Sequence, residues 1–403
     1  MNSFVKLTSA FLLVGLASAG AQPPEASLRD PDPKRRLAAV ESIIDQGGSR
    51  SLDLLAISCQ DGSGAIQQLA VAGIVNFYIP GYVKSGVRGK LVKIGDKIVR
   101  NSTEYAVEPW IRIREQDGQA ILGVFRNPKS EEAKLEAVKA LGSLRYQAAL
   151  PELLPLLKSK QDALMLAALR AVELSENPAA VEETRFLLRD PNEAIHLKAM
   201  TMHGVHRNAG ALPDLAEMFA RKRSKRSEAT ALEAIALIAS PESRGLLEQN
   251  LENRDGALRG YAAEGLGRMK AKDLEERLAA LFAGEGSMRA RLGQAFALVQ
   301  LGRRESGALA PFDYLFNTLN SLAWRGIARA YWMELAREDE VRAWLREKLN
   351  EATKAEKVEL AGILARTGGA EEVELLEKMM RDPDGDIAQE AIKATKLLKS
   401  RLP

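Results

Sequence analysis

Residues 133–144 read AKLEAVKALGSL, and residues 258–269 read LRGYAAEGLGRM. In both stretches a small or aliphatic residue stands at the first position and again four, seven, eight and eleven positions later, which makes one apolar stripe along a helix. Such stretches begin at residues 133, 164, 195, 227, 258, 290, 324, 356 and 387, 31 to 34 residues apart, and two earlier copies begin near Arg35 and Ile66. A period sustained in this way is typical of a solenoid of stacked repeats.

Each apolar helix is followed by a short break and a second apolar run. Examples are the leucines between Leu150 and Leu157, and the run from Leu274 to Phe282. Each unit is therefore expected to be a helical hairpin. Three units are preceded by an Asp-Pro pair, at Asp30, Asp190 and Asp382, where Asp can cap helix amides and Pro fixes the backbone of the turn. The predicted fold is all-α: a right-handed superhelical α-solenoid of about eleven hairpins.

The order of features in one unit is an aspartate turn, an aliphatic residue, often arginine one position later, and then alanines, Leu and Gly. The arginines concerned are Arg36, Arg259, Arg291 and Arg325. Over residues 27–400 this order resembles the short bacterial HEAT repeats, a type also seen in phycobilisome-lyase-like arrays. The resemblance implies an α-solenoid and leaves the function open, because HEAT-like arrays include scaffolds, bilin lyases, a di-iron hydroxylase and DNA glycosylases.

The N-terminus has the pattern of a secretory signal peptide over residues 1–21. Lys6 precedes an apolar run from Leu7 to Leu16, and the small residues of 17–21 provide cleavage patterns ahead of Gln22. We therefore expect an exported protein, periplasmic or extracellular in a bacterium, with no transmembrane segment after cleavage. The single cysteine, Cys59, ends an apolar run and is expected to be a buried packing residue.

The charge balance argues against a nucleic-acid partner. The formal net charge is +3, and removal of the signal peptide with Lys6 leaves +2, which is small for a 44.0 kDa chain that would have to neutralise several phosphates. The basic run from Arg221 to Arg226 is expected to be a solvated loop. The expected partner is another protein or an anionic surface, bound by the solenoid as an interaction scaffold.

The repeats are interrupted between residues 66 and 133. We predict repeats over 22–77, a non-repeat insertion with a degenerate repeat over 78–126, and a repeat array with a C-terminal capping repeat over 127–403. Within the insertion, 90–94 and 97–100 flank Gly95-Asp96, the signal of a β-hairpin near residues 84–106. Residues 84–100 carry six basic side chains and one acidic one. Farther on, the chain is expected to return to a packed helix through six apolar residues: Trp110, Ile111, Ile113, Ile121, Leu122 and Phe125.

Two groups of residues are candidates for binding. The first is in the insertion: Tyr82, Lys90, Lys93, Lys97 and Arg100. These residues would contact an acidic protein, an anionic glycan or a lipid surface, unless the hairpin only covers the solenoid. The second group belongs to an aromatic-rich stretch from Phe312 to Trp344, where Trp324, Tyr331 and Trp332 fall on core positions, whereas Tyr314 and Trp344 lie on second helices and could face a groove.

The three histidines, His196, His203 and His206, lie within eleven residues and are weak candidates for metal ligands. The stripe places His203 and His206 in the core and His196 at the surface. The di-iron hydroxylase of the resembling family has His-Glu pairs, whereas here each histidine is followed by Leu197, Gly204 or Arg207. We expect no cofactor and identify no catalytic residues. The alternative to a scaffold is a lyase-like or hydrolytic enzyme that uses the concave groove, which a buried acid or histidine converging there would favour.

Overall fold

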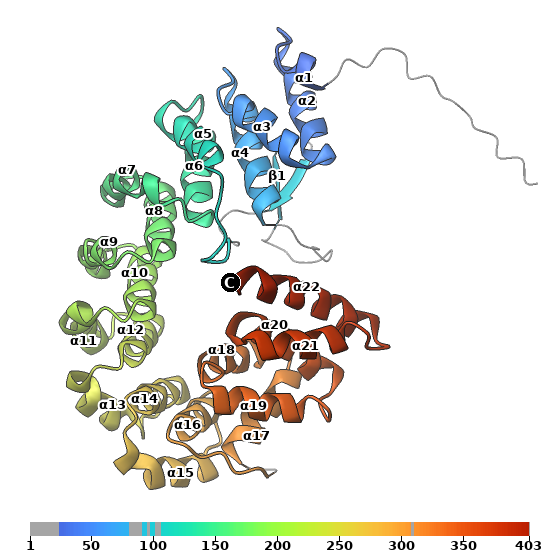
Figure 1. Ribbon diagram of the computed structural model, residues 1–403. Coiled ribbons are helices and arrows are strands. Elements are labelled where there is room, and N and C mark those ends of the chain that lie inside the picture. The colour runs from blue at the N-terminus through green and yellow to red at the C-terminus, as the bar shows by residue number, and fades with distance from the viewer. Residues whose placement is uncertain (1–23, 80–90, 95–96, 101–105, 308–309, 403) are drawn as a thin grey trace, which may run out of the picture. The chain divides into compact units, whose positions relative to one another are not determined.

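The computed structural model describes residues 24–79, 91–94, 97–100, 106–307 and 310–402 (Figure 1). It divides the chain into two compact units. The first comprises Met1–Glu104 with Arg114–Ala140, and the second comprises Tyr105–Ile113 with Leu141–Pro403. The chain passes from the first unit to the second within helix α6, Glu131–Ser143.

The first unit is built mainly of paired helices. They are α1 Pro24–Ser27, α2 Pro33–Gln46, α3 Ser49–Ser58, α4 Gly64–Tyr78 and α5 Glu115–Arg126. The apolar face of α4 is buried, with Ile66 and Leu69 in the core. Cys59 is buried as expected, and burial raises the pKa of its thiol to about 12, which makes it an inert packing residue.

Two short strands lie in the segment for which the sequence predicts a hairpin. β1 Leu91–Ile94 and β2 Lys97–Arg100 pair antiparallel, with Leu91 opposite Arg100 and Ile94 opposite Lys97. Gly95-Asp96, the predicted turn, lies outside the described residues, as do the flanking residues 80–90 and 101–105. Of the six apolar residues expected to return the chain to a packed helix, Ile121, Leu122 and Phe125 lie in α5. Trp110, Ile111 and Ile113 precede α5, which begins at Glu115.

A buried ion cluster fixes the start of α5. Asp117 is fully buried, and its carboxylate accepts hydrogen bonds from the guanidinium of Arg114 and from the hydroxyl of Tyr78 on α4, the latter at 2.6 Å. Arg114 also pairs with Asp53 of α3 at 2.9 Å. The guanidinium of Arg114 therefore joins α3 to the start of α5, and the hydroxyl of Tyr78 adds α4 through Asp117, which explains how the chain resumes its packing after the insertion.

The second unit contains the longer run of hairpins. Its helices after α6 are α7 Leu150–Leu153, α8 Asp162–Ser175, α9 Pro178–Glu182, α10 Glu193–Val205, α11 Leu212–Arg221, α12 Lys225–Ile238, α13 Arg244–Asn250, α14 Gly256–Arg268, α15 Glu275–Gly284, α16 Met288–Gln300, α17 Pro311–Asn317, α18 Arg325–Leu335, α19 Asp339–Lys348, α20 Lys354–Thr367, α21 Ala370–Met379 and α22 Gly385–Arg401. Short 3-10 turns precede or follow several of them.

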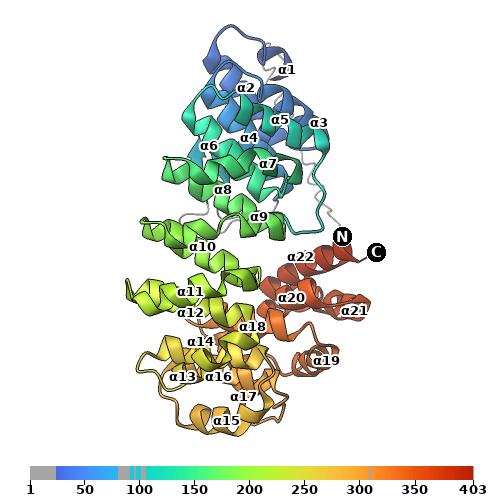
Figure 2. The same cartoon turned by 90° about the vertical axis from the view of Figure 1, so that its left-hand side faces the viewer.

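These helices form two layers (Figures 1 and 2). The even-numbered helices from α8 to α22 each contact the next even-numbered helix, and we call them the first-helix layer. The odd-numbered helices from α7 to α21 form the second-helix layer, packed against the first. Each hairpin touches mainly its neighbours, which is the contact pattern of an α-solenoid and confirms the fold class predicted from the period.

The apolar stripe of the sequence is the core of this unit. Buried residues recur at the stripe positions of successive repeats: Leu164, Ala168 and Val172 in α8, Ile195, Ala199 and Met202 in α10, and Leu258, Ala262 and Leu266 in α14. The glycine nine positions into the repeat allows close contact between neighbouring first helices. A Cβ atom on Gly267 would lie 2.5 Å from the Cα atom of Ala297, and Gly142 and Gly204 stand in the same relation to Ala171 and Ala234.

The turn that ends the first helix has the same left-handed backbone conformation in several repeats, and no residue type in the sequence predicts it. The residue twelve positions into the repeat has positive φ in six successive repeats, at Arg145, Glu176, Arg207, Ala239, Lys270 and Gly302. Only Gly302 is the residue type that favours this left-handed conformation. The second layer is thus positioned by a turn whose residue types vary freely.

The turns between repeats use aspartate differently from the expectation. The carboxylate of Asp30 accepts the backbone N–H of Asp32, and Asp32 in turn caps α2 by accepting from Lys34. Asn192 and Asp384 cap α10 and α22 in the same way, each two residues after the aspartate of an Asp-Pro pair. The Asp of the pair therefore stabilises the turn, and the residue two positions later caps the helix.

Two arginines of the HEAT-like pattern, Arg36 and Arg259, join one turn to the next, whereas Arg291 lies over the rings of Phe282 and Tyr314. Arg259 donates to the carbonyls of Asn253 and Arg254 and binds Glu285 of the following turn at 2.7 Å. In the first unit, Arg36 makes the equivalent contacts with the carbonyls of Asp30 and Pro31 and with Asp61. We call Arg36 and Arg259 the ladder arginines; their contacts between turns give them a structural role that requires no bound ligand.

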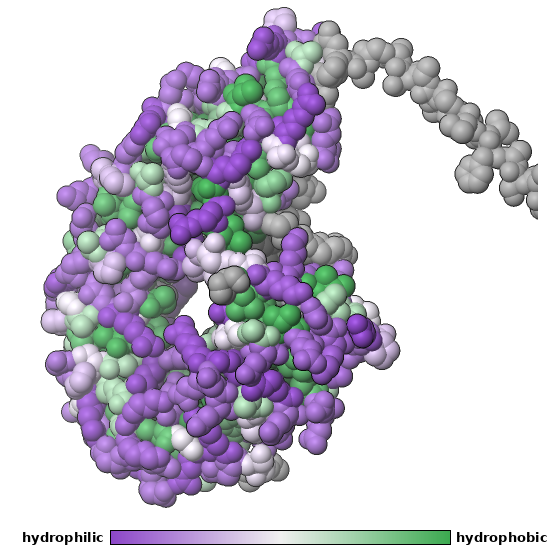
Figure 3. All heavy atoms as spheres, viewed as in Figure 1, coloured by the Kyte–Doolittle hydropathy of each residue, from purple (hydrophilic) through white to green (hydrophobic). Residues whose placement is uncertain are grey.

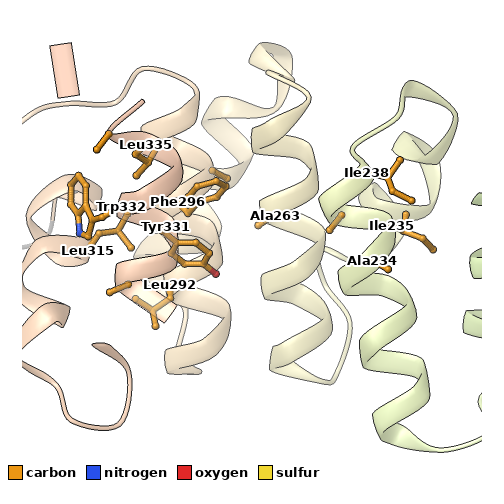
Figure 4. Packing of buried hydrophobic residues seen from close by; sticks show 14 of the residues in the cluster. Ala234, Ile235, Ile238, Ala263, Leu292, Phe296, Leu315, Tyr331, Trp332 and Leu335 are labelled. Atoms are coloured by element: carbon orange, nitrogen blue, oxygen red, sulfur yellow. The ribbon is translucent and has the colours of Figure 1, made fainter. Parts of the chain in front are cut away.

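The aromatic-rich stretch is a packed cluster within the core (Figure 4). Tyr331 and Trp332 of α18 are buried, as predicted, and Phe312 is also buried against Trp332. Trp324 lies half-buried against the same core.

Hydrophilic side chains cover most of the face in Figure 3. Within the described part of the chain, no helix has both the length and the apolar character needed to span a membrane.

Candidate functional site: a charged pocket in the first-helix layer

Four consecutive first helices, α12, α14, α16 and α18, line a pocket of about 330 Å³, which we call the charged pocket. Its lining residues are Glu233, Leu237, Tyr261, Glu264, Arg268, Arg289, Gly326, Ile327, Ala330, Tyr331 and Glu334. The volume is at the lower end of the range for ligand pockets in proteins. Its lining includes apolar residues from α12 and α18 and the charged groups described below.

Glu264 of α14 is the centre of the charged side. Its carboxylate accepts hydrogen bonds from the guanidinium of Arg289 at 2.6 Å, from Arg268 at 3.3 Å and from the hydroxyl of Tyr331. Burial alone raises the pKa of a carboxyl group, but the charges of Arg289 and Arg268 outweigh burial and hold the pKa of Glu264 below its usual value. Glu264 is therefore an ionised carboxylate that is 4% exposed.

The two arginines are fully engaged by groups of the pocket. Arg268 donates through Nε to both carboxylate oxygens of Glu334 at 3.1 Å, and its guanidinium lies 4.8 Å from the ring centre of Phe296. Arg289 donates to the hydroxyl of Tyr331 at 3.0 Å and covers the ring of Tyr261 at 4.3 Å. Neither guanidinium is directed at open space, so the pocket is not arranged to receive an anion.

Close packing of α14 against α16 makes this arrangement possible. A Cβ atom on Gly293 of α16 would lie 2.4 Å from the backbone oxygen of Gly260 on α14. Because both residues are glycine, the two backbones approach closely at this level. Arg289, one turn before Gly293, is thereby brought within hydrogen-bonding distance of Glu264.

Glu233 of α12 differs from the other carboxylates of the pocket. The ion pairs of the pocket use Glu264 and Glu334, and Glu233 takes part in none of them. Burial and, to a smaller extent, the negative charge of Glu264 raise the pKa of Glu233. The same environment, with burial as the largest cause and Glu233 as the next, raises the pKa of Tyr261 to about 12. The pocket thus holds one carboxyl group with a raised pKa beside a neutral phenol.

Of the binding residues predicted from the sequence, the structure describes the side chains of two, Tyr314 and Trp344. Tyr314 on α17 is half-buried, stands edge-on to Phe282 and donates its hydroxyl hydrogen to the sulfur of Met288. Trp344 on α19 stacks on Trp332 with ring centres 5.9 Å apart. Both lie in the second-helix layer and contact the core, whereas the charged pocket is in the first-helix layer. Their role in binding stays a prediction.

The predicted residues of the insertion lie elsewhere. Tyr82 and Lys90 are outside the described residues, and for Lys93, Lys97 and Arg100 only the backbone of the strands is described. The basic segment is therefore known as a pair of strands and not as a set of side-chain contacts.

The histidine assignment needs a correction. His196, expected at the surface, is buried and donates through Nδ1 to the carbonyl of Asp190 at 3.0 Å. It occupies the position of the ladder arginines, but the next turn has Lys222 where other turns have an acid, so an arginine there would lack its partner. His206, expected in the core, is half-buried at the end of α10 and donates through Nε2 to the carbonyl of Glu173.

His203 is buried, as predicted. Thr184 donates its hydroxyl hydrogen to Val181, so it accepts a hydrogen bond from Nε2 of His203, while Asn208 donates to Nδ1. Burial is the main cause that lowers the pKa of His203 to about 4, which keeps the ring neutral. Within the described residues, no three His, Cys, Asp or Glu side chains come together as a metal site.

Sequence reasoning missed the charged pocket, although a signal for it exists. Glu233 and Glu264 stand at the same place, six positions into their repeats, next to the buried positions seven and eight. A charged residue recurring beside the core stripe in adjacent repeats places two carboxylates side by side in the first-helix layer. Arg289 lies at a repeat boundary, where charges are common, so its role could be found only in three dimensions.

Comparison with protein-family models finds no match, and comparison with curated proteins finds none either. Solved structures similar to this chain include an engineered protein, at 15% identity and TM-score 0.40, over 93% of this chain and 98% of that one. Kap121p bound to Ste12p is 13% identical with TM-score 0.40, over 93% of this chain and 44% of that one. Human deoxyhypusine hydroxylase in complex with glycerol is 16% identical with TM-score 0.32, over 64% and 99% of the two chains. At these scores none of them bears on function.

Proposed function

We propose that this chain is an exported scaffold of about eleven HEAT-like hairpins that binds another protein. The observation that supports it best is the charged pocket, because a repeat array presents its first-helix layer as an extended surface and here that layer contains buried charges with apolar walls. Export rests on the signal-peptide pattern of residues 1–21. A mature N-terminus beginning at Gln22 in the exported fraction would support it, and retention of the full precursor in the cytoplasm would refute it.

The test of the scaffold is affinity capture of partners from native exported material. Three baits are compared: the wild type, a variant with the pocket altered by Glu233→Gln, and a variant lacking 84–100. A partner retained by the wild type and lost with one variant assigns that region to binding. If the wild type retains nothing above a scrambled-bait control, the scaffold proposal fails.

The basic segment is the second part of this proposal. Residues 84–100 carry a net charge of +5 and would attract an acidic region of the partner, an anionic glycan or a lipid surface. Capture that is salt-sensitive only when this segment is present would support that role. Capture that is indifferent to its removal would make the strands a cover for the solenoid.

A second candidate function is a lyase-like or hydrolytic enzyme, which one observation favours. A carboxyl group with a raised pKa, such as Glu233, is suited to donate a proton near neutral pH. If the chain is an enzyme, a captured ligand should be converted by the wild type and recovered unchanged from Glu233→Gln. Recovery of the unchanged ligand from both proteins would exclude this role for Glu233.

A further inference from the structure

The charged pocket has an excess of negative groups. Among its lining residues are three carboxylates, Glu233, Glu264 and Glu334, and two guanidinium groups, Arg268 and Arg289. The guanidinium groups bind Glu264 and Glu334, as described above. Glu233 has a hydrogen bond with Tyr261 but forms no ion pair with either guanidinium, so the next charge that the pocket can accommodate is positive.

The adjacent repeat shows what Glu233 lacks. Glu264 accepts hydrogen bonds from two arginines. Arg268 is four residues later on the same helix, and Arg289 stands one residue before the start of the next repeat. At the equivalent places around Glu233, the chain has Leu237 and Ala257. Both repeats thus have a glutamate at this position, but only the repeat of Glu264 has arginines at the two neighbouring positions.

The walls suit an alkyl stem that carries a cation. Leu237 lies one turn from Glu233, and Ile327 and Ala330 of α18 complete an apolar side. Ala330 is exposed, so this side of the pocket is open to solvent. Basic side chains bury their methylene groups along apolar surface and extend the charged head to a partner, which is the geometry offered here. A volume of about 330 Å³ admits one such side chain but not a folded element.

We propose that the charged pocket binds a basic side chain of the partner protein, whose ammonium or guanidinium group pairs with Glu233 in place of the arginines that the adjacent repeat supplies. The inference rests on the proposed scaffold function and adds the chemistry of the partner. The bound cation takes the position that Arg268 or Arg289 occupies relative to Glu264.

Binding should depend on pH in one direction. The groups that face Glu233 are Tyr261, Glu264 and Arg268 on α14, Arg289 on α16, and Tyr331 and Glu334 on α18; Arg207, after α10, reaches Glu334. Tyr261 and Tyr331 have raised pKa values, and so do Arg268 and Arg289, so none of these four groups changes its charge near neutrality. A cation favours the ionised form of Glu233, so binding releases a proton and affinity rises with pH until Glu233 is ionised in the free protein.

The direct test uses defined probes and the full-length protein. Blocked lysine and arginine, each with an acetylated N-terminus and an amidated C-terminus, are titrated by ligand-observed NMR, alongside blocked Nε-acetyl-lysine as the neutral control and blocked glutamate as the anionic one. We expect the two cations to bind at least tenfold more tightly than either control. Equal binding of the neutral or the anionic probe would overturn the proposal.

Two variants and a matched control separate the pocket from general charge effects. Glu233→Gln should weaken cation binding at least tenfold, and Leu237→Arg should do the same because it supplies an internal cation. Glu347→Gln changes the net charge equally on the exposed surface of α19 and should leave binding unchanged. Circular dichroism and thermal unfolding establish that each variant folds. If a folded Glu233→Gln binds the cations as the wild type does, the proposal is wrong.

Capture experiments distinguish the two levels of the argument. A partner retained by the wild type and by both pocket variants would keep the scaffold function and refute the pocket inference. If the free blocked amino acids bind but a blocked five-residue peptide, Gly-Gly-Lys-Gly-Gly, does not, then the pocket takes a small amine and not a side chain of a protein, and the proposal is overturned in that form.

Discussion

The repeats that contain α12 and α14 place a glutamate at the same position, and the two glutamates differ in their hydrogen-bond partners and in the direction of their pKa shifts. Glu264 is buried among two arginines and a tyrosine, and its pKa is lowered. Among the described residues Glu233 forms no ion pair; it has a hydrogen bond with Tyr261, and its pKa is raised, mainly by burial. The backbone position is the same, but Glu233 has Leu237 and Ala257 where Glu264 has two arginines, and the charges of Arg289 and Arg268 act on Glu233 too weakly to outweigh burial. In a solenoid, the charge state of a site is therefore decided by positions one turn or one repeat away.

The largest expected effect concerns Glu264. Glu264→Gln removes the charge that balances Arg289, and breaking a buried pair by removal of one partner costs about 3–5 kcal/mol of unfolding free energy. Chemical denaturation at pH 7 measures the loss. A change below 1 kcal/mol would mean that water or Glu334 takes over the pairing, and the contrast between the two repeats would then be much weaker than the contacts indicate.

The helices α12 and α14 also show which features could be predicted from the sequence and which could not. The thirty-one-residue period identifies α12 and α14 and their buried faces, because burial of an apolar stripe is a local consequence of helix geometry. The partners of Glu264 come from α16 and α18, as far as Tyr331, and no local pattern selects them. His196 differs from its expected surface position for a similar reason: it is buried against the turn before its helix, where Nδ1 donates to the carbonyl of Asp190, and the apolar stripe does not include this contact. The left-handed turns could not be predicted from the sequence either, because five of the six residues with positive φ are not glycine.

A second buried group tests whether desolvation alone can set a charge state in this layer. Burial lowers the pKa of His203 to about 4, against about 6.5 in an unfolded chain. Between those values the unfolded chain binds more protons, so stability is complete above pH 6.5 and falls as the pH drops toward 4. The loss approaches about 3 kcal/mol at pH 4.

The experiment compares His203→Leu with the wild type by denaturation at pH 7 and pH 4.5. Replacement by leucine should remove most of the acid-side decline while changing stability little at pH 7, since Thr184 and Asn208 keep their bonds to Val181 and Glu182. The double change of His203 and His206 to Leu should likewise tolerate a chelator without a shift in melting. A steeper decline in the leucine variant would show that His203 is ionised in the folded state.

The same substitution that destabilises at Glu264 should act in the opposite direction at Glu233. With its raised pKa, Glu233 binds a proton more tightly in the folded chain, so its contribution to stability is lost as pH rises from the unfolded pKa through the raised folded value. Glu233→Gln removes that loss and should raise the melting temperature at pH 8 relative to the wild type, with little difference at pH 4. A lower melting temperature at pH 8 would mean that Glu233 is ionised and stabilised by a partner.

The smallest effect on stability is expected in the basic segment, residues 84–100, which lies outside the repeats. Replacement of Lys90, Lys93, Lys97 and Arg100 by Ser removes four of the six basic groups of 84–100. Exposed charges contribute about 0–1 kcal/mol per pair even when matched, so the melting temperature should stay nearly unchanged. If the segment is a binding arm, capture should weaken and lose its salt dependence, because attraction between exposed charges is screened within about 8 Å at physiological ionic strength. Unchanged capture with a clear loss of stability would instead make the strands a structural cover, and would leave the charged pocket as the site at which partner binding has to be tested.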